Sequence, residues 1–154
     1  MICLEKPKLR GYLRLLILHM LKEKPMHGYA IMTELEKRYG IPEPSAGAIY
    51  PVLSELKRLK LIEMEGRGKR EKKVYRITEE GLKFLEENRE ELNEILQKIE
   101  AYKEFSKLGG RELAKTMKEL LEKLPELNEN QKERIREEIL EFTRRIKLIL
   151  LGGD

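Results

Sequence analysis

The chain has 154 residues, a length that predicts one compact domain, or a small domain with an assembly arm, and excludes a large multidomain enzyme. Charged residues make up 39% and hydrophobic residues 40%, so a charged surface should cover an aliphatic core. The single cysteine, Cys3, excludes an intramolecular disulfide framework and fits a reducing, cytoplasmic compartment.

The net charge of +4 is unevenly distributed along the chain. Residues 1–85 carry a net +7, which suggests a polyanionic partner, and residues 86–154 carry a net −3 with heptad-like spacing, which suggests helix pairing. The chain is rich in Lys and Glu and poor in Gln, a thermophile-like composition. We expect no export signal or membrane segment, because the apolar runs are short and the N-terminus is charged.

Two amphipathic helices are predicted at the start of the chain. Apolar residues recur at spacings of three and four over 9–21, and Lys24-Pro25 should end that helix. The same spacing recurs over 28–39, where Gly40 supplies the stop.

A third helix should begin at Ser45, which can cap it. Pro51 is unusual there, because a proline beyond the first turn removes a helical hydrogen bond and tends to kink the helix. The predicted apolar stripe consists of Ile49, Val52, Leu53, Leu56 and Leu59.

Alternating apolar residues then predict a β-hairpin over 61–65 and 74–77. Thr78 can cap a following long helix that reaches Tyr102, and Gly109-Gly110 should break the chain. A shorter helix over 113–124 and a last helix over 135–149 complete the prediction, and Asn128 with Gln131 resembles a capping box before the last one.

The helices after residue 80 carry apolar stripes that a single chain would leave exposed. We interpret the stripes as a dimer interface. The alternative, a membrane-surface helix using Arg144, Arg145 and Lys147, is disfavoured because acidic residues share that polar face. The predicted dimerisation residues are Leu92, Ile95, Ile99, Tyr102, Ile135, Ile139, Phe142, Ile146 and Ile149.

Three helices followed by a hairpin within about 80 residues are the element order of a winged helix-turn-helix domain. We therefore predict a mainly α fold with a small β-hairpin. Residues 1–80 should form the winged helix-turn-helix DNA-binding domain, and residues 81–154 a C-terminal helical dimerisation arm.

The third helix is the predicted recognition helix. Its face opposite Ile49, Leu53, Leu56 and Lys60 is small and polar enough to approach base edges, although a solvated surface helix would show the same pattern. The residues predicted to contact DNA from this helix are Ser45, Gly47, Tyr50, Ser54, Lys57 and Arg58.

The hairpin tip, residues 66–73, has five basic residues and one acidic residue. In isolation such a run is usually a solvated loop, but after a recognition-type helix it predicts a wing on phosphates or in a minor groove. The wing should provide affinity more than sequence preference. Its predicted contact residues are Arg67, Lys69, Arg70, Lys72 and Lys73.

The chain resembles the PadR-type transcriptional regulators in four stretches within residues 9–85. The stretches are Lys24-Pro25-Met26-His27-Gly28-Tyr29, Ser45-Ala46-Gly47-Ala48-Ile49-Tyr50-Pro51-Val52-Leu53, Leu56-Lys57-Arg58-Leu59-Lys60-Leu61-Ile62 and Tyr75-Arg76-Ile77-Thr78-Glu79-Glu80-Gly81. The resemblance implies a homodimeric repressor that binds double-stranded DNA at an operator with dyad symmetry. It also implies that the Tyr50-Pro51 pair is a family feature, and that a small-molecule effector, unknown for this chain, acts on many members.

Catalytic and metal-binding functions find no support in the sequence. His19 and His27 lack a partner at metal-ligand spacing, so structural roles are favoured, with His27 capping or packing the second helix. Gly109-Gly110 does not form a phosphate-binding motif, and no cofactor is expected. Two alternatives to a regulator stay open: a winged-helix protein-interaction module and a sequence-indifferent architectural DNA-binding protein.

Overall fold

The computed structural model describes residues 6–40, 46–66 and 73–153. The chain divides into two compact units, Met1–Leu108 and Gly109–Asp154. The first unit contains the predicted winged helix together with two further helices, and the second contains the last helices of the chain. The functional division after residue 80 remains a prediction.

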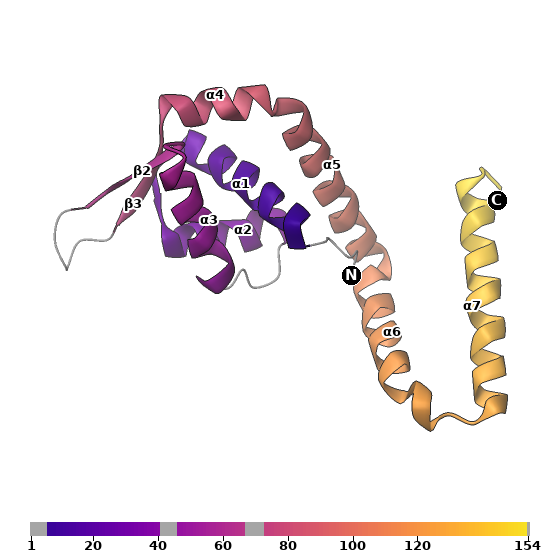
Figure 1. Ribbon diagram of the computed structural model, residues 1–154. Coiled ribbons are helices and arrows are strands. Elements are labelled where there is room, and N and C mark those ends of the chain that lie inside the picture. The colour runs from indigo at the N-terminus through magenta and orange to yellow at the C-terminus, as the bar shows by residue number, and fades with distance from the viewer. Residues whose placement is uncertain (1–5, 41–45, 67–72, 154) are drawn as a thin grey trace. The chain divides into compact units, whose positions relative to one another are not determined.

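Helix α1 (Lys6–Glu23) lies at the centre of the first unit, where α2, α3, α4, α5 and β3 pack around it (Figure 1). The predicted amphipathic stripe is only part of its buried surface, because Leu15 and Leu18 on other faces are also buried. A helix that is apolar on most sides is a core helix. The prediction of one apolar face was therefore too narrow.

Helices α2 (Gly28–Tyr39) and α3 (Ala46–Arg58) form the helix-turn-helix. Gly40 ends α2 with a left-handed φ of 61°, as the sequence predicted. The guanidinium of Arg38 joins α2 to α1, since Nη1 lies 2.7 Å from Oε2 of Glu23 and Nε lies 2.6 Å from Oε2 of Glu34.

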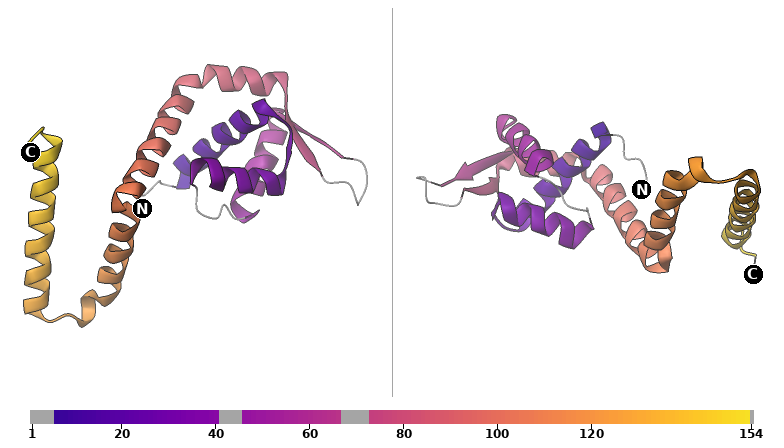
Figure 2. Two further views of the ribbon diagram at one scale, coloured as in Figure 1. Left: turned by 180° about the vertical axis from the view of Figure 1, so that it is seen from behind. Right: turned by 90° about the horizontal axis from the view of Figure 1, so that it is seen from below.

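Three short antiparallel strands form a sheet in the order β1-β3-β2. The predicted hairpin is confirmed as β2 (Ile62–Glu65) and β3 (Val74–Ile77), and it extends away from the three helices in both views of Figure 2. Strand β1 (Met26–His27) was missed, because two residues are too short to show alternation. It pairs with β3 and so joins the start of α2 to the base of the wing.

The turn after α3 connects the recognition helix to the rest of the unit. Helix α3 ends at Arg58, so Leu59 and Lys60 lie beyond it. Leu59 is exposed, and Lys60 has a left-handed φ of 60°. Contrary to prediction, neither residue belongs to the buried side of α3. The hydroxyl of Thr78 donates to the carbonyl of Lys60 at 2.6 Å and accepts from the amide of Gly81 at 3.0 Å. Thr78 is thus the predicted helix cap and also a link to the end of α3.

The predicted long helix after Thr78 is two helices, α4 (Glu79–Glu87) and α5 (Arg89–Phe105). The break is at Asn88, where φ is −107° and ψ is 22°, and the side-chain Nδ2 donates to the carbonyl of Phe84 at 2.8 Å. A short polar side chain that bonds nearby backbone in this way competes with the regular helix. The periodicity continued across the break and therefore concealed it.

The second unit holds α6 (Arg111–Lys123) and α7 (Glu129–Leu150), with the short helix η2 (Leu124–Glu126) between them. Gly109, in the segment η1 (Ser106–Gly110), has a φ of 96°, which explains the predicted break. The predicted capping box is confirmed: the amide of Gln131 donates to Oδ1 of Asn128 at 2.8 Å, and the amide of Asn128 donates to Oε1 of Gln131 at 3.0 Å. Neither α6 nor α7 has a buried residue.

Candidate nucleic-acid interface

Helix α3 presents opposite faces of different chemistry. Its inner face consists of Ile49, Val52, Leu53 and Leu56, each at most 1% exposed. The outer face is exposed and consists of Gly47, Tyr50, Pro51, Ser54, Lys57 and Arg58. The helix is thereby fixed to the core by four aliphatic side chains, while its predicted DNA-contacting face remains accessible. Ser45, the predicted cap, lies outside the described residues.

Pro51 is accommodated within α3 without ending it. It is exposed, on the same side as Tyr50 and Ser54. Pro51 and Ser54 are therefore the short side chains of the outer face, and its long basic side chains, Lys57 and Arg58, lie in the last turn. Cations at a helix C-terminus also interact favourably with the helix dipole.

The cations of this face form no ion pair with any acid in the described part of the chain. This applies to Lys57 and Arg58, and it applies also to Lys73 in the hairpin tip. On α7, in contrast, Arg144 and Arg145 both lie 2.8 Å from Oε1 of Glu141. Positive charge is therefore uncompensated at Lys57, Arg58 and Lys73, and it is compensated at Arg144 and Arg145.

The wing is anchored by its strands. Tyr75 on β3 is 8% exposed and lies opposite Met64 of β2 in the sheet register. On the solvent side, Nη2 of Arg76 lies 3.0 Å from Oε2 of Glu65 across the two strands. Four predicted wing contacts, Arg67, Lys69, Arg70 and Lys72, lie outside the described residues.

The perturbed pKa values in the first unit result from packing and ion pairing in the scaffold. Burial lowers the pKa of His19 on α1, and burial raises the pKa of Tyr75. Hydrogen bonds to Glu23 and Glu34 raise the pKa of Arg38. His27 lies at the N-cap position of α2 without a side-chain capping bond, so the structure does not show the predicted capping role, and the packing role stays a prediction.

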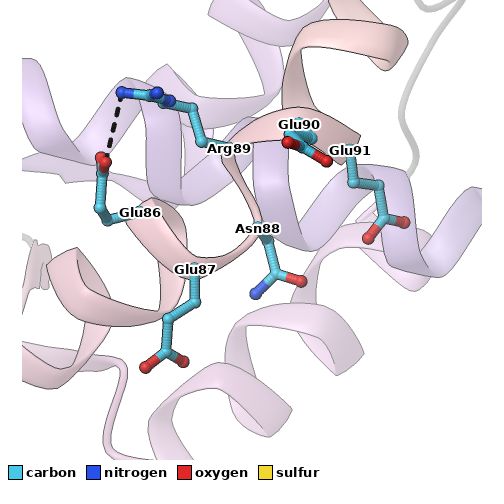
Figure 3. A pocket seen from close by; sticks show the side chains of 6 residues that line it. All are labelled: Glu86, Glu87, Asn88, Arg89, Glu90 and Glu91. Carbon is cyan, nitrogen blue, oxygen red and sulfur yellow. Dashed lines mark ion pairs between the residues drawn. The ribbon is translucent and has the colours of Figure 1, made fainter.

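Metal-binding side chains do not cluster among residues 6–40, 46–66 and 73–153. These ranges contain no group of three or more His, Cys, Asp or Glu side chains that could hold a metal ion. A depression of about 360 Å³ at the α4–α5 break is lined by Glu86, Glu87, Asn88, Arg89, Glu90 and Glu91 (Figure 3). The side chains that line it are mostly exposed. Its one cation is Arg89, whose Nη1 lies 3.3 Å from Oε1 of Glu86. No helix within the described ranges is long and apolar enough to cross a membrane.

The predicted dimerisation residues fall into two groups. Leu92 and Ile95 are 5% and 3% exposed, because α5 packs on α1 within the same unit. These two residues are therefore core residues and are not available to a partner, contrary to prediction. Those that are at least partly exposed are Ile99, Tyr102, Ile135, Ile139, Phe142, Ile146 and Ile149.

Comparison with known proteins identifies a family and several relatives. Residues 17–87 match the model of the transcriptional regulator PadR-like family. The transcriptional regulator YqjI of Escherichia coli K12 is 41% identical over 95 residues, which are 59% of this chain and 44% of YqjI. The alignment with this curated relative thus spans less than half of its length.

Solved structures provide matches that extend over nearly the whole relative. A PadR-like transcriptional regulator of Bacillus cereus is 30% identical, with a TM-score of 0.51 over 62% of this chain and 95% of that chain. A transcriptional regulator of Clostridium thermocellum is 24% identical, with a TM-score of 0.51 over 61% of this chain and 92% of that chain, and it shares the fold.

One family accounts for the winged-helix fold, for the match over residues 17–87 and for the identity to the Bacillus cereus regulator. PadR-like regulators bind DNA and are not enzymes, which agrees with the exposed basic face of α3. The chain belongs to the PadR-like family of transcriptional regulators.

Proposed function

We propose that the protein is a homodimeric, sequence-specific repressor that acts in the cytoplasm on an operator with dyad symmetry. Helix α3 lies in the major groove, and the wing contacts phosphates or the minor groove. Two recognition helices in a dimer then read half-sites about 34 Å apart, one turn of duplex.

The uncompensated cations on the outer face of α3 are the observation that carries this proposal. Lys57 and Arg58 are exposed and form no ion pair with any acid in the described ranges. Their side chains suit phosphate oxygens or guanine, and Ser54 suits a base edge or a phosphate. The basic tip of the wing, residues 67–73, adds sequence-independent affinity.

The homodimer rests on the apolar face of α7. Ile139, Phe142, Ile146 and Ile149 recur at spacings of three and four and are 41–63% exposed. A stripe of this spacing is typical of a helix that pairs with another helix. A second copy of the chain supplies a matching stripe, because a two-fold axis brings identical surfaces together.

Fluorescence anisotropy on a duplex from the promoter of the encoding gene, against a scrambled duplex of equal length, tests sequence-specific binding. We expect a preference of about a thousandfold at about 150 mM salt. Equal binding to the two duplexes would instead indicate an architectural protein. No binding to either would favour a protein-interaction module.

The salt dependence of binding tests the assignment of α3. The variant K57A/R58A removes four cations from a dimer, so the slope of log K against log salt should become shallower by about 3 to 4 if all four meet phosphates. R144A/R145A is the matched control, because both guanidiniums are already paired with Glu141. An equal change of slope in the two variants would show that net charge, and not the α3 face, determines binding.

Sedimentation equilibrium tests the dimer. The variant I146K places a cation in the apolar stripe of α7 and should shift the mass toward that of a monomer. E137K is the control, because Glu137 lies on the opposite side of the helix at 100° per residue. A dimer that survives I146K would place the interface elsewhere.

A further inference from the structure

The side chain of Tyr50 on α3 lies against the first residue of α2. A Cβ atom added to Gly28 would lie 2.9 Å from the hydroxyl oxygen of Tyr50 and 3.2 Å from its Cε1 and Cζ atoms. Gly28 is buried, whereas Tyr50 is 45% exposed. The edge of the phenol therefore lies close to the position that a Cβ atom of residue 28 would occupy, and Tyr50 stays partly exposed on the outer face of α3.

The contact joins three elements of the winged helix. Gly28 directly follows β1, whose His27 pairs with Val74 of β3. Burial raises the pKa of Tyr75 on β3, and the nearby phenol of Tyr50 raises it further. The ring of Tyr50 thus lies where the recognition helix, the start of α2 and the wing strand meet.

Helix propensity does not explain a glycine at position 28. Gly28 is the first residue of α2 and is neither its N-cap nor its C-cap, so no capping preference calls for glycine there. The backbone at Gly28 also has no left-handed φ that would require glycine, unlike Gly40. What distinguishes the position is the ring of Tyr50, which occupies the space that a methyl group would need.

We infer that Gly28 is a positioning residue for Tyr50. Because residue 28 has no side chain, the Tyr50 phenol keeps the orientation that contacts DNA. This inference rests on the proposed function and assigns a role to a residue outside the predicted DNA-contacting set. It also connects the His27-Gly28-Tyr29 and Tyr50-Pro51 stretches, which meet in space although they are more than twenty residues apart.

A double-mutant cycle tests the inference with the full-length protein and the promoter duplex. G28A should weaken binding about tenfold, because the added methyl displaces the phenol, while Y50A/G28A should bind as Y50A does. G11A is the matched control, since Gly11 is also helical and a Cβ there would meet nothing within 4 Å. An effect of G28A that is equal with and without the Tyr50 ring would overturn the inference.

A measurement without DNA separates this inference from the proposed function. The aromatic Cε–Hε signal of Tyr50, assigned by its loss in Y50F, should shift in G28A and stay unchanged in G11A. An unmoved signal in G28A would overturn the inference even if the protein binds its operator. A shifted signal in a protein that prefers no duplex would instead refute the regulator and retain the contact.

Discussion

Replacement of Thr78 by Val removes two hydrogen bonds at the junction of α3, the wing and α4 while nearly preserving the shape of the side chain. The Gly81 amide loses its capping acceptor, which costs about 1 kcal/mol. The Lys60 carbonyl loses the donor at 2.6 Å, which costs about 1 kcal/mol more. The free energy of unfolding should fall by about 2 kcal/mol in total, and the melting temperature by about 4–8 °C for a chain of this length.

Thermal unfolding followed by circular dichroism measures this effect at one protein concentration, because association would shift the midpoint. T78S retains both hydrogen bonds and should melt close to the wild type. T116V is the control for a surface Thr→Val change, since Thr116 is exposed on α6. If T78V melted within about 1 °C of the wild type, or if T116V lost as much, the junction would not contribute as described.

Three further outcomes follow from other sites. Leu92→Ala should reduce the free energy of unfolding by about 2–5 kcal/mol and leave the oligomeric mass unchanged, as sedimentation can verify, because Leu92 is a core residue. Burial lowers the pKa of His19, so His19 binds a proton more readily in the unfolded chain than in the folded chain. The free energy of unfolding should therefore fall as the pH drops below about 6.5. The denaturant midpoint of H19Q should fall less over the same pH range. Hydrogen bonds to Arg144 and Arg145 depress the pKa of Glu141 to about 2. The difference in melting temperature between the wild type and E141Q should therefore persist above pH 4.5 and disappear as the pH falls through about 2. A difference that is constant with pH would contradict the pairing.

Local signals in the sequence predicted most elements of the fold. Gly40, Thr78 and Asn128 each mark a helix end through their own backbone or side-chain chemistry, and the structure confirms all three. Such residues act within one turn of the helix they delimit, so no knowledge of the tertiary structure is needed.

Two of the missed features depend on contacts between distant segments. The two residues of β1 are a strand only because β3 lies beside them, and the stripe of α5 divides into core and surface only because α1 covers Leu92 and Ile95. Periodicity alone reports that a face is apolar and does not report what covers it.

The outer face of α3 could be predicted because a helix of known orientation leaves few choices for its exposed residues. The importance of Gly28 could not, since its neighbour Tyr50 is separated from it by the whole of α2. The available signal in the sequence was a glycine at the first position of a helix, where the backbone does not need it. This signal does not say which distant residue lies against the glycine.

The capping box and the ion pairs of helix α7 all lie within the helix and its cap. Its 22 residues include no buried side chain, yet the capping box and the pairs of Glu133, Glu141 and Glu129 with basic residues three or four positions on stabilise the helical state. We expect such a segment to keep more helical order than an uncapped helix without ion pairs would keep before its apolar face is covered. Association through α7 would then resemble the docking of two preformed rods, with little loss of backbone entropy, and should be fast compared with assembly that requires folding on contact.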